Sequence, residues 1–124
     1  MFLQGLSLAE RVQYLSSIAH RKSVIRINGA IFRDYIKATP RNYSFVIMFT
    51  AMAQQRQCMI CRVASDEFHI VANSFRYSQA YSNKLFFGVV DFDEGSDIFN
   101  LVSIDIKKNL NLFDSLIFID KFSF

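Results

Sequence analysis

The stretch that decides the fold is Ser44-Phe45-Val46-Ile47-Met48-Phe49-Thr50, followed shortly by Cys58-Met59-Ile60-Cys61. The first segment is a nearly continuous apolar run, which is typical of a strand covered on both faces by helices in a parallel sheet. Small and amide residues at 51–57 predict a loop that leads to Cys58. Apolar residues spaced by three and four then predict a helix from Cys58 to about Tyr77.

The chain on either side of this segment continues the alternation of strands and helices. The other predicted elements are a helix at 6–19 with Ser7 and Glu10 as a capping box, a strand at 23–27, a short helix at 30–37, a strand at 84–91 and a short helix beyond Gly95-Ser96. This order predicts a mainly parallel α/β core. Leu116-Ile117-Phe118-Ile119 is compatible with a fourth strand, although no Gly or Pro marks its ends.

The bulk composition fits one compact domain. The chain has 124 residues, of which 52% are hydrophobic, and its net charge is +3. Residues 1–62 carry nine Lys or Arg and two Asp or Glu, whereas residues 63–124 carry five and nine. Because the basic residues are scattered and no nucleic-acid motif accompanies them, we expect a solvated surface and no nucleic-acid partner.

Neither a membrane span nor a convincing signal peptide is expected in this chain. No segment reaches the roughly 18 consecutive apolar residues that a membrane helix needs. The start, Met1-Phe2-Leu3-Gln4-Gly5-Leu6, is apolar but short and lacks a basic region before it.

Cys58 and Cys61 are the two cysteines of the chain, and their position predicts a thiol–disulfide site. A helix N-terminus offers free backbone amides and a partial positive charge, both of which stabilise a thiolate. We expect Cys58 to be the exposed nucleophile and Cys61, one turn later, to be the resolving thiol; Arg56 could add positive charge. A C-x-x-C motif after a buried strand predicts a thioredoxin-like domain.

Two other interpretations of the cysteines are less favoured. A zinc site usually needs four ligands, and the further candidates are His20 and His69 with no second C-x-x-C. The cysteines could also be two buried, unreactive thiols in an intracellular core. We therefore expect no metal and no cofactor. The intervening Met59-Ile60 pair is apolar and could attract unfolded chains, or Ile60 could pack inward.

Several longer segments resemble one known family. They are 40–44 (PRNYS), 46–51 (VIMFTA), 55–62 (QRQCMICR), 70–78 (IVANSFRYS), 83–87 (NKLFF) and 90–99 (VDFDEGSDIF). Together they resemble the lumenal domain of an oligosaccharyltransferase accessory subunit. This family includes the tumour-suppressor-candidate and magnesium-transporter subunits and the yeast Ost-three and Ost-six proteins. The resemblance covers roughly residues 6–105.

The resemblance implies a function in protein N-linked glycosylation. The family is built as a lumenal thioredoxin domain followed by four membrane helices, with some members linked to magnesium transport. Its C-x-x-C forms transient mixed disulfides with nascent glycoproteins in the endoplasmic reticulum, while another subunit transfers the glycan. Carried over, Cys58 attacks, Cys61 resolves, and the partners are oligosaccharyltransferase subunits and cysteine-containing nascent polypeptides.

The end of the chain departs from the family pattern. Family members continue near Asp105 with a cis-proline that faces the C-x-x-C, whereas this chain has Ile106-Lys107-Lys108 there. We therefore expect a partial thioredoxin-like domain at 1–105, incomplete at its C-terminal side, and a divergent tail at 106–124. The alternative functions are a general thiol–disulfide oxidoreductase, which would be an enzyme in its own right, and a non-functional truncated isoform.

Two polar features complete the candidate sites. Asn42-Tyr43-Ser44 is an N-x-S sequon, so Asn42 could carry a glycan in the secretory lumen. Asp91, Asp93, Glu94 and Asp97 follow the third strand, but their spacing does not fit a calcium loop. Solvation and helix N-terminal charge explain this acidic cluster better.

Overall fold

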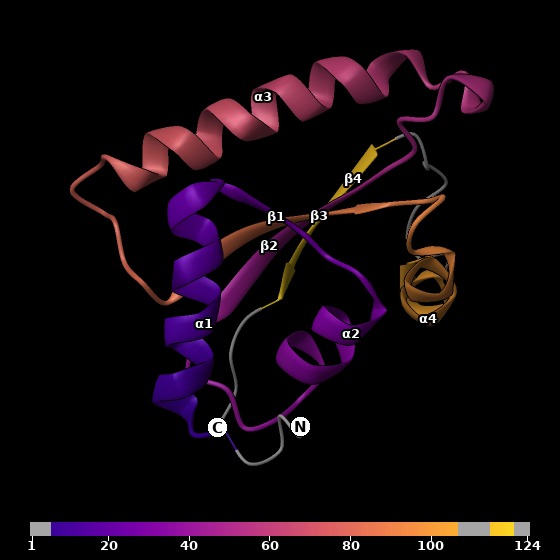
Figure 1. Ribbon diagram of the computed structural model, residues 1–124. Helices are drawn as coiled ribbons and strands as arrows, with labels where there is room; N and C mark the ends of the chain where they lie inside the picture. Colours follow the sequence, from indigo (N-terminus) through magenta and orange to yellow (C-terminus); the bar gives the residue numbers. More distant parts are fainter. Residues whose placement is uncertain (1–5, 107–114, 121–124) are drawn as a thin grey trace.

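A four-stranded sheet forms the centre of the chain in the computed structural model, which describes residues 6–106 and 115–120 (Figure 1). The strands are β1 (Val24–Arg26), β2 (Ser44–Thr50), β3 (Leu85–Asp91) and β4 (Ser115–Asp120), in the spatial order β1-β3-β2-β4. The first three are parallel, as predicted, and β4 pairs antiparallel with β2. β4 includes the segment 116–119, which the sequence left open as a strand.

Helices connect the strands and cover both faces of the sheet (Figure 1). They are α1 (Leu8–Arg21), α2 (Gly29–Ile31), α3 (Met59–Arg76) and α4 (Ser96–Ile106), with short turns η2 (Phe32–Ile36) and η3 (Gln54–Arg56). The predicted capping box of α1 is confirmed: the Glu10 N–H donates to Ser7 Oγ at 3.1 Å, and the Ser7 N–H donates to Glu10 Oε1 at 2.8 Å.

The predicted short helix at 30–37 is confirmed over residues 29–36, where α2 continues into the π-helical turn η2. The Lys37 N–H donates to the Phe32 carbonyl at 2.8 Å, five residues back. This wider turn allows Phe32, Tyr35 and Ile36 all to be buried. Packing of these three side chains against the core explains why the regular α-helical spacing is not kept.

Alternating strand residues divide the core into two layers. One layer packs the sheet against α1, α2 and α4 and includes Leu15, Phe45, Ile47, Phe86 and Ile98. The other layer packs the sheet against α3 and consists of Val24, Met48, Phe68, Ala72 and Phe87. The continuous apolar run of β2 therefore serves both faces, which confirms the prediction of a strand covered on each side.

The α/β class with a central sheet flanked by helices is confirmed, and the strand order and helix placement are consistent with a thioredoxin-like fold. In parallel strands the carboxyl ends meet at one edge. The loop after β2 leads there to Cys58, and the loop after β3 leads to Asp93. Lys107 and Lys108, where the resemblance expects a proline, lie outside the described residues.

Candidate functional site

Cys58 and Cys61 form a disulfide at the start of α3. Their Cα atoms are 5.4 Å apart, which lies within the usual range of about 4.4–6.8 Å for a disulfide. Cys58 is the N-cap residue of α3 with an extended backbone, and Cys61 lies in the first turn. The first backbone N–H groups of a helix carry a partial positive charge, and Cys58 lies at that end of α3.

The two cysteines differ in accessibility. Cys61 is 0% exposed, whereas Cys58 is half-buried. A second thiol or disulfide in solution can therefore approach Cys58, but it cannot reach Cys61 without local opening of the first turn of α3. This asymmetry is what a pair with one exchanging and one resolving sulfur requires.

Exposed apolar side chains follow Cys58 at the start of α3. Met59 is 90% exposed, Val63 52% and Ile60 49%. Residue 63 lies four positions after residue 59 and three after residue 60, so its side chain neighbours both on the helix surface. Ile60 therefore does not pack into the core. Exposed apolar side chains beside a reactive group favour contact with an apolar partner.

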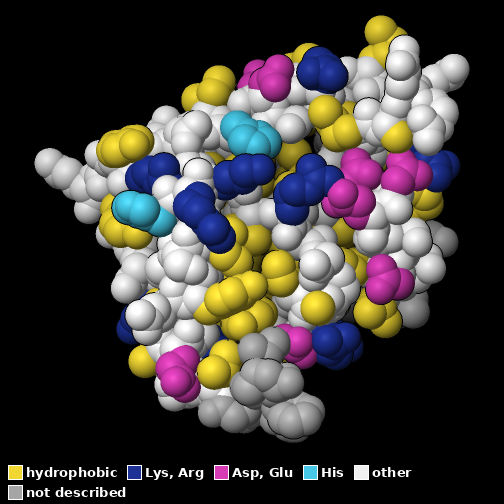
Figure 2. All heavy atoms as spheres, viewed as in Figure 1, with side chains coloured by type: hydrophobic (Ala, Val, Ile, Leu, Met, Phe, Trp, Pro, Cys, Tyr) yellow, Lys and Arg dark blue, Asp and Glu magenta, His cyan; other side chains and the backbone are white. Residues whose placement is uncertain are grey.

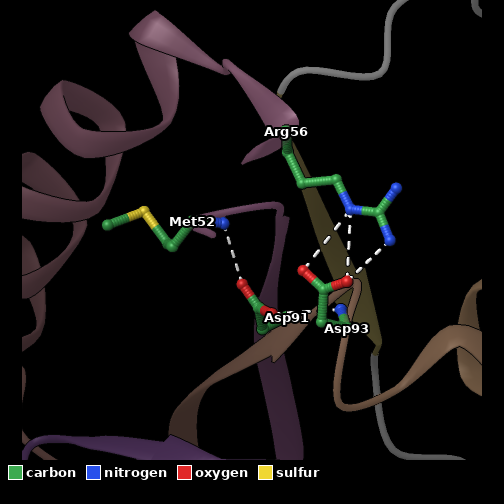
Figure 3. A network of polar contacts seen from close by, with 4 residues as sticks. All are labelled: Met52, Arg56, Asp91 and Asp93. Carbon is green, nitrogen blue, oxygen red and sulfur yellow. Dashed lines mark hydrogen bonds and ion pairs between the residues drawn. The ribbon is translucent and has the colours of Figure 1, made fainter. Parts of the chain in front are cut away.

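Two carboxylates fasten the loop 51–57 that leads to Cys58 (Figure 3). The Met52 N–H donates to Asp91 Oδ1 at 2.9 Å, at the beginning of the loop. At its end, Arg56 Nη2 and Nε donate to Asp93 Oδ1 at 2.6 and 3.2 Å. The Asp93 backbone N–H in turn donates to Asp91 Oδ2 at 3.1 Å, so the Asp91 carboxylate also holds the start of the loop that carries Asp93.

Arg56 does not present a free charge to the thiol site as the sequence suggested. Its guanidinium points to Asp93 in Figure 3 and lies 4.6 Å from the centre of the Phe92 ring. The hydrogen bonds to Asp93 raise the pKa of Arg56 above its ordinary value. Asp93 therefore compensates the positive charge, and the pair connects the loop after β2 to the loop after β3.

The acidic cluster is only partly explained by solvation and helix charge. Asp97 does lie in the first turn of α4. Asp91 and Asp93 instead hold the loop before Cys58, and Glu94 forms an ion pair with Arg26 of β1. The signal that could have revealed these ties is the meeting of β2 and β3 at their carboxyl ends, with Arg56 after one strand and Asp93 after the other.

The structure separates the residues that the zinc alternative would need. The two histidines lie apart on the face shown in Figure 2, with basic side chains between them. His69 Nδ1 contacts the Ser65 carbonyl at 2.8 Å, and His20 is exposed near the end of α1. Within the described ranges 6–106 and 115–120, no group of three His, Cys, Asp or Glu side chains is placed to hold a metal ion.

Asn42 lies just before β2 and is half-buried. Its Oδ1 atom is enclosed and has no hydrogen-bond partner among the described residues. Glycosylation of Asn42 stays a prediction from the N-x-S sequon.

The sequence comparison identifies the family. The model of the OST3 / OST6 family, transporter family, matches residues 13–114. The chain belongs to the OST3/OST6 family. The resemblance drawn from the segments around the disulfide is thereby confirmed, and the matched range of this family contains both cysteines and the loop that leads to them.

Relatives within the OST3/OST6 family are named as glycosyltransferase subunits. The chain is 52% identical over 98 residues to mouse "Dolichyl-diphosphooligosaccharide--protein glycosyltransferase subunit MAGT1", which covers 79% of the chain and 29% of that protein. The human protein of the same name is 50% identical over the same shares. Subunit 3 from Schizosaccharomyces pombe is 26% identical over 99 residues, covering 80% of the chain and 32% of that subunit.

The chain thus spans about three tenths of the length of these relatives, at 29–32% of each. Across the residues that the structure describes, no helix combines the length and the apolar character needed to cross a bilayer.

Proposed function

We propose that this chain is the thiol–disulfide domain of an accessory subunit of the oligosaccharyltransferase complex, and that it holds cysteine-containing nascent polypeptides through transient mixed disulfides. The observation that carries the proposal is the accessible Cys58 joined to a fully buried Cys61. The names of the relatives support the complex, and the exposed Met59, Ile60 and Val63 support an apolar contact with an unfolded partner.

The exchange begins at the accessible sulfur. A thiolate of the nascent polypeptide attacks Cys58 Sγ and forms a mixed disulfide, while the bond to Cys61 breaks and Cys61 leaves as a thiolate. The reverse step releases the polypeptide: Cys61 attacks Cys58 Sγ, the Cys58–Cys61 bond forms again, and the thiolate of the polypeptide leaves. The cycle consumes no oxidant or reductant, because the partner leaves in the redox state in which it arrived.

The cellular setting follows from this role. We place the domain, predicted at residues 1–105 with a divergent tail at 106–124, on the lumenal side of the endoplasmic reticulum. Its partners are other subunits of the complex and unfolded glycoproteins, and the glycan is transferred by another subunit. Holding an acceptor segment near the transferase would delay the local folding that hides the acceptor.

Capture of nascent chains tests the proposal. The chain is introduced into the lumen of microsomes that translate a cysteine-containing glycoprotein, and adducts are counted on non-reducing gels. In Cys61→Ser the Cys58 thiolate attacks a disulfide of the glycoprotein, a mixed disulfide forms, and one glycoprotein sulfur leaves as a thiolate. Because no resolving thiol is present to release the glycoprotein, we expect at least about a tenfold increase in mixed disulfides over the wild type. Cys58→Ser is the matched control and is expected to form none. Equal adduct levels for the two variants would refute the proposal.

The rate of insulin reduction distinguishes a general oxidoreductase from a domain that holds its partners. A holding domain forms adducts with unfolded glycoproteins but reduces insulin slowly in the presence of dithiothreitol. Rapid insulin reduction by the wild type, without accumulation of glycoprotein adducts on Cys61→Ser, would favour the oxidoreductase instead.

A further inference from the structure

We propose that Arg56, Phe92 and Asp93 form a clamp that positions Cys58 against Cys61 and so sets how readily the disulfide closes. This inference rests on the proposed function, because it concerns the same disulfide. Arg56 and Asp93 belong to different loops, after β2 and after β3, and they meet at the edge of the sheet beside α3 (Figure 3).

The two cysteines are anchored in different ways. Cys61 lies inside α3, is fully buried, and moves only with a helix that Phe68 and Ala72 pack onto the sheet. Cys58 precedes the helix and directly follows the loop 51–57. Gln57, directly before it, has a left-handed backbone with φ of 54°, so the chain turns sharply there. The position of Cys58 therefore depends on the loop 51–57.

The clamp connects that loop to the core through a chain of contacts. The Arg56 guanidinium lies over the Phe92 ring at 4.6 Å and makes two hydrogen bonds to Asp93 Oδ1. The Phe92 ring packs edge-on against Phe99 of α4, with centroids 5.2 Å apart. Phe99 packs edge-on against Phe49 of β2, with centroids 5.1 Å apart. Through these contacts Arg56, two residues before Cys58, is connected to Phe49 in the buried centre of the sheet.

Loosening the clamp should weaken the disulfide relative to the dithiol. A disulfide closes readily when its sulfurs are held near each other, because little freedom is lost on closure. If the loop is released, Cys58 samples more positions around a fixed Cys61. We expect reduction to become more favourable and Cys61 to resolve a mixed disulfide more slowly, each by about three- to tenfold for an exposed ion pair with a cation–π contact.

Asp93→Asn in the full chain tests the clamp through two readouts. The first is the equilibrium constant of the Cys58–Cys61 disulfide with dithiothreitol, which we expect to shift toward the dithiol by about two- to fivefold, because this variant removes the ion pair and leaves the cation–π contact. The second is cleavage by trypsin after Arg56, which we expect to accelerate because the released loop fits the protease. Faster cleavage with an unchanged equilibrium constant would overturn the proposal, since the loop would then not position Cys58.

Arg56→Gln and the double variant separate positioning from simple charge. Positioning predicts that Arg56→Gln shifts the equilibrium in the same direction as Asp93→Asn, and that the double variant is no worse than Arg56→Gln alone. A charge effect on the Cys58 thiolate predicts opposite shifts for the two single variants, which would overturn the proposal. Glu94 lies on the same loop as Asp93 and forms an ion pair with Arg26 of β1. Glu94→Gln breaks that ion pair, so it is the matched control and should leave the equilibrium constant of the disulfide unchanged.

The outcomes also separate the clamp from the proposed function. Chemical reduction requires no partner protein, so a shift in Asp93→Asn without any capture of glycoproteins would support the clamp and refute the holding function. Capture of glycoproteins, together with an unchanged equilibrium constant in both Asp93→Asn and Arg56→Gln, would support the holding function and refute the clamp.

Discussion

Reduced Cys58 is expected to react with iodoacetamide at least about 100-fold faster than Cys61, because Cys61 reacts only after its helical turn opens. Cys61 is 0% exposed in the first turn of α3, and Cys58 is half-buried at the N-cap. An opening that costs about 3 kcal/mol would suffice for this ratio.

The variants Cys61→Ser and Cys58→Ser, each with one remaining thiol, give the two rates separately by mass spectrometry. The same measurement in concentrated denaturant is the control, and there the two rates should come within a few-fold of each other. Comparable rates in the folded protein would contradict the division into an exchanging and a resolving sulfur.

Phe45→Ala is expected to lower the free energy of unfolding by about 3–5 kcal/mol, as for other large aromatic residues truncated in a core. Phe45 is 0% exposed in β2 and lies opposite Phe86 of β3, with ring centroids 5.6 Å apart. It also packs edge-on against Tyr43 at 6.1 Å. Truncation would empty a site between two strands and cost much of the 5–15 kcal/mol that is typical of single domains.

Urea unfolding of the disulfide-bonded chain, followed by circular dichroism, measures this loss. Tyr77→Ala is the matched control, because this aromatic side chain is 81% exposed at the end of α3 and should change stability by about 0.5 kcal/mol or less. A loss below about 1 kcal/mol for Phe45→Ala would contradict the packing of β2 between two layers. A gradual transition in the wild type would favour the truncated, non-functional alternative.

The strand β2 and the helix α3 could be predicted because each has a clear apolar pattern: a continuous run in the strand, and a spacing of three and four residues in the helix. The predicted strand at 44–50 has the bounds of β2, and the predicted helix from Cys58 to about Tyr77 differs from α3 by one residue at each end. Both segments have an uninterrupted apolar pattern, and the burial of that pattern drives their formation. The position of the cysteine pair at the start of α3 followed from the same pattern.

The π-helical turn at Phe32–Ile36 could not be predicted in the same way. Apolar spacing within eight residues cannot distinguish α-helical from π-helical hydrogen bonding, because both leave Phe32 and Ile36 near one face. The choice is made by tertiary packing, which buries Tyr35 as well.

The pairing of Arg56 with Asp93 could not be predicted from local sequence pattern alone. The two residues are 37 positions apart, and each lies in a loop whose course depends on where β2 and β3 end. Sequence reasoning identified both residues but assigned Arg56 to the thiol and Asp93 to solvent. Local pattern predicts elements well, whereas contacts between loops depend on the assembled sheet.

Locating the first mixed disulfide tests the central claim most directly. Reduced wild-type chain is mixed with a peptide whose single cysteine is activated as a disulfide with thionitrobenzoate, quenched with acid at millisecond intervals, and mapped by mass spectrometry. The predicted result is an adduct first on Cys58, followed by the Cys58–Cys61 disulfide and an equal amount of released peptide thiol. An adduct that forms first on Cys61, or one on Cys58 that Cys61 never resolves, would contradict the exchange mechanism.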